Sequence, residues 1–243
     1  MSGASGRGSA SRAGSRRAGG SVGGQPGDGP TVPVRPASAG ALLRRRFEGT
    51  HHVDEWGLDP DAVRLLSPLV GLRWSVEAQG TERIPASGPA VLVHNRGIGL
   101  SELVVLARGV RRATGRHVRT AGLVDVAPLA TVGRALGAVV DRPDELRGLL
   151  RAGELVGLPL GRDLSRPRRA GPLVPEALAP ALDTCAAVIP VALVGPVVGR
   201  NWRLLVGRPL ALPPDRGPLA VAEVVDQARA GVETLLAEAA RRF

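Results

Sequence analysis

The chain has 243 residues, of which 44% are apolar and only 2% are aromatic, and its formal net charge is +10. It contains no tyrosine. It also contains no lysine, so all 32 residues counted as Lys or Arg are arginine. This composition excludes a P-loop lysine, a Schiff-base lysine and a Tyr-Lys dehydrogenase site. The length suffices for one α/β domain with a sizeable core.

The chain begins with a basic segment of low complexity. Residues 1–46 hold eight arginines and a single acid, Asp28, so this segment carries most of the net charge. Residues 1–40 are mainly Gly, Ser, Arg, Ala and Pro, which cannot bury enough apolar surface to offset the entropy of ordering. We therefore expect residues 1–46 to form a disordered tail and residues 47–243 to form the folded domain.

Three interpretations of this tail are open. It can be a solvated segment without a specific partner, an arginine arm on anionic lipid headgroups, or a Gly/Arg segment that contacts RNA. The tail lacks the aromatic residues on which bases stack, so we expect no nucleic-acid partner.

Helical and strand patterns alternate along the rest of the chain. Asp59-Pro60 opens a helix, as an N-cap followed by proline in the first turn. Its apolar face comprises Val63, Leu66, Leu69 and Val70, and we expect this face to lie in the core, with docking to a membrane as the alternative. Further strands are predicted at 91–94, 118–122, 137–141, 154–158, 187–194 and 202–206, and helices at 101–112, 144–152 and 219–242. This alternation predicts a single α/β layered domain with a largely parallel sheet.

The sole cysteine and the apolar runs bear on the cellular compartment. Cys185 cannot form an intramolecular disulfide, which fits a reducing cytoplasm, and its flanks predict a buried thiol. No apolar segment of a signal peptide is visible near the N-terminus. The longest apolar run, 186–199, is too short to span a bilayer. We expect a cytoplasmic protein that can still lie on a membrane surface.

Three motifs follow predicted strands in order. The first reads His94-Asn95-Arg96-Gly97-Ile98-Gly99-Leu100-Ser101-Glu102, after an apolar strand. The second is a GxxxxR stretch from Gly137 to Arg142, and the third is Gly157-Leu158-Pro159-Leu160-Gly161-Arg162. With the flanking runs at 54–57, 80–85 and 149–157, the chain over residues 54–210 resembles the glycerophospholipid acyltransferase family. Bacterial members of that family make phosphatidic acid from lysophosphatidic acid.

The resemblance implies acyl transfer from acyl-CoA or acyl-carrier protein to a lysophospholipid hydroxyl in phospholipid synthesis, without a metal or other cofactor. The family's first motif is N-H-x4-D, and Arg96 stands at its histidine and Ser101 at its aspartate. The third motif is F-P-E-G, and Leu160 stands at its glutamate. A guanidinium stays charged and cannot act as a general base. Two alternatives therefore stay open: an enzyme with a substitute base, or a catalytically silent lipid-binding or regulatory relative.

Two residues are candidates to replace the motif histidine and aspartate. His94 lies two positions before Arg96, so period-two alternation places both on one side of the strand end. Glu102, at the start of the next helix, is then the candidate to orient His94. A structural histidine at a strand end is the simpler interpretation.

The resemblance also implies a set of substrate-binding residues. Arg142 matches the arginine that binds the glycerol phosphate, and the planar guanidinium suits phosphate oxygens. Pro190 matches a proline of the acyl-binding region. The other matching positions are Asn95, Gly137, Pro159, Gly161 and Arg162. Because the implied substrates are membrane lipids, we expect peripheral contact with the anionic inner face of the cell membrane.

Competing motifs are weaker. Gly97-Ile98-Gly99 after a strand is typical of a dinucleotide loop, but Glu102 stands where the third glycine belongs. No G-x-S-x-G nucleophile elbow follows a predicted strand, so we do not expect a serine hydrolase. The adjacent histidines His51 and His52 lack a partner cluster and are interpreted as a surface segment.

Overall fold

The computed structural model describes residues 40–41, 44–45, 48–49, 52–97, 101–122, 129–161, 170–196 and 199–241. All of them belong to one compact unit, residues 37–243. Residues 1–39 of the basic tail lie outside the described residues, so the disorder expected there stays a prediction.

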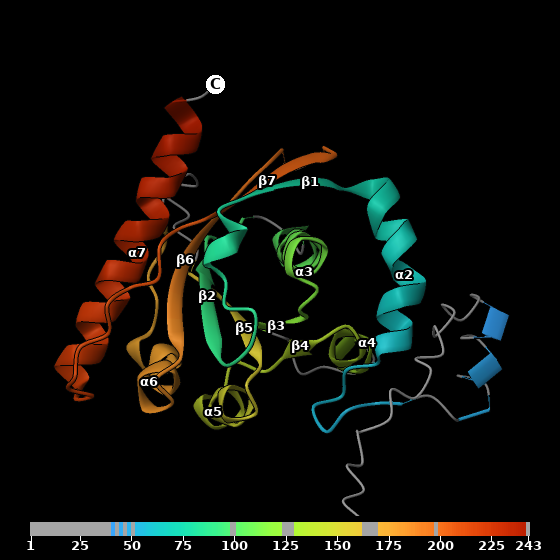
Figure 1. The fold of residues 1–243 in the computed structure, drawn as a ribbon, viewed down its shortest axis with the longest axis horizontal. Coiled ribbons are helices and arrows are strands. Elements are labelled where there is room, and N and C mark those ends of the chain that lie inside the picture. The colour runs from blue at the N-terminus through green and yellow to red at the C-terminus, as the bar shows by residue number, and fades with distance from the viewer. Residues whose placement is uncertain are drawn as a thin grey trace, which may run out of the picture. The chain divides into compact units, whose positions relative to one another are not determined.

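A seven-stranded sheet runs through the described part of this unit (Figure 1). Its strand order is β1-β7-β6-β2-β5-β3-β4. The strands are β1 (Ser75–Gln79), β2 (Ala90–His94), β3 (Val118–Ala121), β4 (Ala138–Val139), β5 (Leu155–Pro159), β6 (Ala187–Val194) and β7 (Asn201–Val206). The five strands from β6 to β4 run parallel, whereas β7 is antiparallel to β6, and β1 is parallel to β7. The prediction of an α/β fold with a largely parallel sheet is confirmed.

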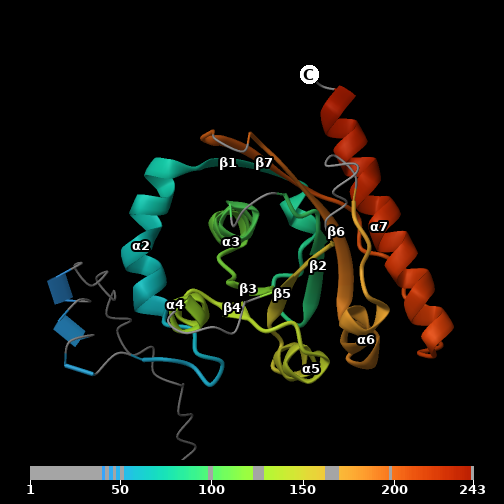
Figure 2. The same ribbon diagram turned by 180° about the vertical axis from the view of Figure 1, so that it is seen from behind.

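Helices cover both faces of the sheet. The α-helices in the described part of the chain are α2 (Pro60–Arg73), α3 (Ser101–Thr114), α4 (Leu129–Ala135), α5 (Pro143–Arg151), α6 (Pro175–Asp183) and α7 (Pro218–Arg241), and a 3-10 turn, η1, spans Thr81–Arg83. Figures 1 and 2 show α5, α6 and α7 along one face and α3 against the other. This arrangement buries both faces of the central strands.

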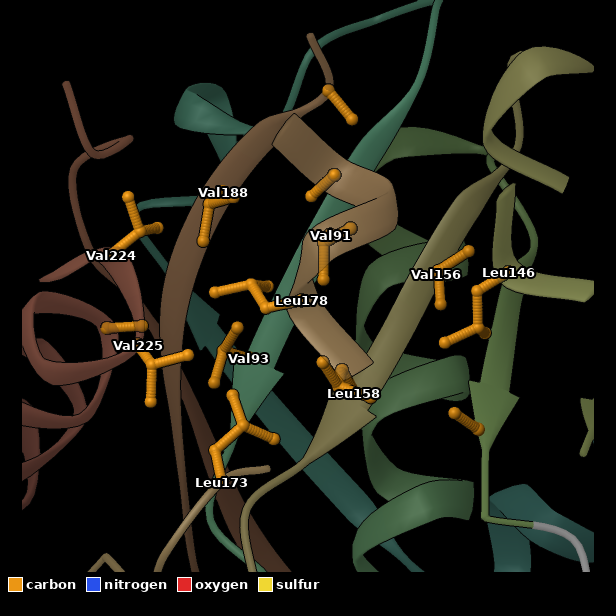
Figure 3. Packing of buried hydrophobic residues seen from close by; sticks show 14 of the residues in the cluster. Val91, Val93, Leu146, Val156, Leu158, Leu173, Leu178, Val188, Val224 and Val225 are labelled. Atoms are coloured by element: carbon orange, nitrogen blue, oxygen red, sulfur yellow. The ribbon is translucent and has the colours of Figure 1, made fainter. Parts of the chain in front are cut away.

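The period of two along β2 assigns its side chains to two separate cores. Val91 and Val93 face α5, α6 and α7, where they belong to a cluster with Leu178 and Val224 (Figure 3). Ala90 and Leu92 face α3 and its residue Leu106. His94 continues the second set, so its side chain belongs to the face that α3 covers.

The helix α2 differs from its prediction. Asp59 caps it as expected, because its carboxylate accepts hydrogen bonds from the N–H groups of Asp61 and Ala62. None of its residues is buried, however, and the exposed fractions of Leu69 and Leu72 are 62% and 70%. The expectation that its apolar face lies in the core is therefore wrong. In the described part of the chain, no helix has the length and apolarity that crossing a bilayer requires.

The environment of Cys185 is also unlike the prediction. The residue lies in the turn between α6 and β6, where it is exposed and adopts a φ of 53°. Its Sγ lies 2.9 Å from Nη2 of Arg216. The expected buried thiol is wrong because this tight turn directs the side chain to solvent rather than into the adjacent core.

Candidate functional site

The motif residues meet at one edge of the sheet. Strands β2, β5, β3 and β4 are parallel neighbours, so the segments that follow them lie side by side. We call this the carboxyl edge; it is formed by His94–Gly97, Gly122, Val140–Arg142 and Pro159–Gly161. His94 is in register with Pro159, and the N–H of Leu160 donates to the carbonyl oxygen of His94 at 2.7 Å. In open α/β sheets, ligands bind outside the carboxyl ends of the strands.

His94 is fully buried at the end of β2. Its Nδ1 lies 2.9 Å from the carbonyl oxygen of Asn95. A carbonyl oxygen only accepts, so Nδ1 carries the proton of the neutral ring and Nε2 is left with a free lone pair. Nε2 is buried and has no hydrogen-bond partner in the described part of the chain.

Burial makes His94 a weak base. Loss of hydration lowers the pKa of His94 to about 4, and the positive charge of Arg96 adds to this, whereas the hydrogen bond to Asn95 opposes it. The imidazole is therefore neutral at pH 7. A general base works best when its pKa is near the working pH, and the pKa of His94 is well below 7.

Glu102 does not form the expected pair with His94. It lies in the first turn of α3, where it is buried, and no described residue forms a hydrogen bond with its Oε2. The other carboxylate oxygen lies against Gly97, at the position that a Cβ there would occupy. Neither nitrogen of His94 is bonded to it, so the expectation that Glu102 orients His94 is wrong for this structure.

Arg96 extends along the carboxyl edge. Its Nη1 lies 3.7 Å from the position that a Cβ on Gly122 would take, next to the ring of Pro159. The side chain therefore reaches from the end of β2 across β5 to the end of β3. No acidic side chain among the described residues forms an ion pair with Arg96. Among the described residues, the carboxyl edge therefore presents the guanidinium of Arg96 without a paired acid.

Asn95 and Gly161, two of the predicted substrate-binding residues, form hydrogen bonds with the backbone of other segments. The amide of Asn95 accepts from the N–H of Leu193 at 2.7 Å and donates to the carbonyl oxygen of the same residue at 2.9 Å. It thereby clamps the end of β2 to β6. The N–H of Gly161 donates to the carbonyl oxygen of Pro172 at 2.6 Å, and a Cβ on Gly161 would meet that oxygen. Their predicted contacts with substrate stay predictions.

Gly137 and Pro190 also have packing roles. Gly137 adopts a φ of 90° in the turn before β4, a conformation that favours glycine. Pro190 is buried in β6, and its ring fills the space left by Gly207 and Gly231, where added Cβ atoms would lie 2.8 Å from its Cγ. These residues support the architecture around the carboxyl edge.

The second and third motifs differ in exposure. Arg142 is exposed at the start of α5, and Pro159 is half-buried beside His94. Leu160, at the position of the family's glutamate, is fully buried and belongs to the core on the α5–α7 face. Arg162 lies outside the described residues.

A buried ionic network that the sequence did not reveal lies near the amino ends of β3 and β5. Arg119, in β3, is 1% exposed, and its Nη2 pairs with Asp54 and lies 3.4 Å from Oε1 of Glu154. Partial burial opposes ionisation of Asp54, but hydrogen bonds from Arg119 and from the N–H groups of Leu58 and Trp56 outweigh it and lower the pKa of Asp54. Through Asp54, this network anchors the run Asp54-Glu55-Trp56-Gly57, which precedes α2.

Comparisons with known proteins agree with this architecture. No protein-family model and no curated protein sequence matches the chain. The crystal structure of the 1-acyl-sn-glycerophosphate (LPA) acyltransferase PlsC from Thermotoga maritima is similar, with a TM-score of 0.52 and 20% sequence identity. The similarity covers 81% of this chain and 87% of the enzyme. The chain therefore has the α/β fold of that acyltransferase.

Proposed function

We propose that this protein binds a lysophospholipid and an acyl thioester, either acyl-CoA or acyl-carrier protein, at the carboxyl edge as a catalytically silent relative of the acyltransferases. The observation that carries this proposal is the guanidinium of Arg96, which pairs with no acid in the described part of the chain and stands at the position that the resemblance gives to the motif histidine. A permanently charged group cannot take a proton from the acceptor hydroxyl. The one imidazole at this edge, His94, is buried and weakly basic.

The same edge suits an anionic headgroup. Arg142 is exposed, and no acid in the described part of the chain pairs with it. It follows β4, the strand beside β3, and the guanidinium of Arg96 reaches the end of β3. Adjacent strands are about 5 Å apart, and we propose that both cations contact one phosphate-bearing ligand at this edge.

One observation favours acyl transfer as a second candidate function. The hydrogen bond of Nδ1 of His94 to Asn95 leaves Nε2 as the basic nitrogen, which is the tautomer that a general base needs. A ligand-induced opening of this edge would then have to expose Nε2.

An acyl-transfer assay with radiolabelled acyl-CoA and lysophosphatidate separates these functions. We expect background turnover from the wild type and a gain of about 10²–10⁴-fold from Arg96→His/Ser101→Asp, which restores the base and its carboxylate. Ser101 is the first residue of α3, where an aspartate also suits the helix dipole. Arg112→His, on the exposed part of α3, is the matched control.

Two results would contradict the proposal. Brisk turnover by the wild type that His94→Gln abolishes would establish His94 as the base. Failure of the wild type to bind lysophosphatidate, or binding that Arg142→Gln leaves unchanged, would remove the ligand assignment.

Membrane contact is part of the same proposal. The ligands are membrane lipids, α2 exposes Leu69 and Leu72, and the first 46 residues carry eight arginines. Each basic residue close to an anionic surface contributes about 1 kcal/mol before screening by salt. We infer peripheral binding to the inner face of the cell membrane.

A further inference from the structure

The side chain of Arg108 connects α3 to α2. Nη1 of Arg108 donates to the carbonyl oxygen of Ser67 at 3.2 Å. The guanidinium of Arg108 also lies over Gly71, where a Cβ would be 2.7 Å from Nη2. Arg64 lies one helical turn before Ser67, and Arg111 lies one turn after Arg108. We call Arg64, Arg108 and Arg111 the arginine cluster.

The cluster has more positive than negative charge. The carboxylate nearest to it among the described residues is Asp61, which pairs with Arg64 at 3.1 Å and also lies 3.8 Å from Arg45. Nε of Arg108 and Nη1 of Arg111 are buried and have no hydrogen-bond partner among the described residues. Burial lowers the pKa of Arg111, and the charge of Arg64 lowers it further, so the two guanidinium groups repel each other. Buried donors of this kind are costly unless an acceptor reaches them.

We propose that the arginine cluster binds a phosphate group at a site separate from the carboxyl edge. Guanidinium groups present forked donors that match phosphate oxygens, and three arginines against one carboxylate leave two positive charges for a dianion. Arg111 lies ten residues beyond Ser101, about 15 Å along α3, so this site does not include the residues of the first motif.

Two sources of phosphate share this chemistry. One is the headgroup of an anionic phospholipid, which the exposed Leu69 and Leu72 of α2 would help to hold at a membrane surface. The other is a soluble phosphate ester. Either ligand would add acceptors beside the guanidinium groups of the arginine cluster and would offset the repulsion between Arg64 and Arg111.

The first test measures thermal unfolding of the full chain in chloride and in glycerol 3-phosphate at equal ionic strength. We expect the phosphate ester to raise the Tm of the wild type and of Arg112→Gln, but to raise the Tm of Arg111→Gln much less. Arg112 is the exposed neighbour of Arg111, so both variants lose the same charge. Titration should give a Kd about tenfold weaker for Arg111→Gln than for Arg112→Gln. Binding of phosphate at the carboxyl edge would raise the Tm of both variants equally, so it does not affect the comparison between them.

A second expectation concerns the protein without phosphate. In chloride, Arg111→Gln should unfold at the same temperature as the wild type or higher, because it removes a repulsive charge. Arg64→Gln, at a half-exposed side chain on the surface of α2, repeats the comparison if Arg111→Gln fails to fold.

The second test distinguishes the two sources. Flotation with phosphatidylcholine vesicles, with and without phosphatidic acid, is compared for the wild type, Arg111→Gln and Leu69→Gln/Leu72→Gln. A lipid ligand predicts that both variants lose the preference for phosphatidic acid. A soluble ester predicts that only the response to glycerol 3-phosphate depends on Arg111. Equal phosphate responses in Arg111→Gln and Arg112→Gln, or no response in the wild type, would overturn the site.

Discussion

The burial of His94 predicts a specific dependence of stability on pH. Its pKa is about 4 in the folded protein and about 6.5 in an unfolded chain. Between these values the unfolded state binds a proton that the folded state does not bind, so stability falls as the pH decreases from 6.5 towards 4. This one residue should destabilise the fold by about 2 kcal/mol at pH 5 and by about 3 kcal/mol at pH 4, relative to pH 7.5.

Urea unfolding of the wild type and of His94→Gln at pH 7.5, 6 and 5 measures this effect. Glutamine does not titrate, so the difference between the two proteins isolates His94 from the other ionisable groups. We expect the wild type to lose about 2 kcal/mol more than His94→Gln between pH 7.5 and pH 5. Parallel curves would mean that His94 is protonated as easily in the folded state as in the unfolded one. The argument that it is too buried to act as a base would then be wrong.

Four further predictions follow from the described contacts. Leu160→Glu should destabilise the protein by about 4 kcal/mol or more, because a fully buried leucine is replaced by a carboxylate; urea unfolding measures this. Asp54→Asn should cost about 2–3 kcal/mol in the same assay, less than the loss of a fully buried ion pair, because Glu154 still lies 3.4 Å from Arg119. Cys185 should react stoichiometrically with a thiol reagent without denaturant, and slow reaction would contradict its exposure. Vesicle flotation of a chain starting at Phe47 should be weaker and less sensitive to salt than that of the full chain.

The fold was predictable where local pattern and tertiary environment agree. The apolar strands that became β2, β5 and β6 and the capped helix α2 were expected near their observed positions. The strand β1 was missed because Ser75–Gln79 is an edge strand of mixed polarity, held by its pairing with β7. The helix α6 was missed because Pro180 interrupts its pattern, although the proline is buried against the core. Both elements depend on partners that are distant in the sequence.

The site was predictable in position but not in detail. Motif order predicted that Asn95, Arg142 and Gly161 lie at one edge, because each follows a strand of one parallel sheet. Sequence could not show that His94 is sealed from solvent or that Leu160 belongs to the core. It also could not identify Arg119, because a charged residue in a short strand is normally expected to face solvent.

The three altered motif positions differ in how deeply the fold depends on them. Arg96 and Ser101 are half-buried, and neither contributes to the two hydrophobic cores. Leu160 is an integral part of the core, and its backbone N–H is bonded to His94. Restoring the glutamate at that position would bury a charge and disturb the contact between β2 and β5. If the protein is catalytically silent as proposed, acyl transfer should therefore be sought through Arg96 and Ser101 with Leu160 retained. If that double variant binds lysophosphatidate and still fails to transfer an acyl group, the buried leucine becomes the remaining obstacle to catalysis.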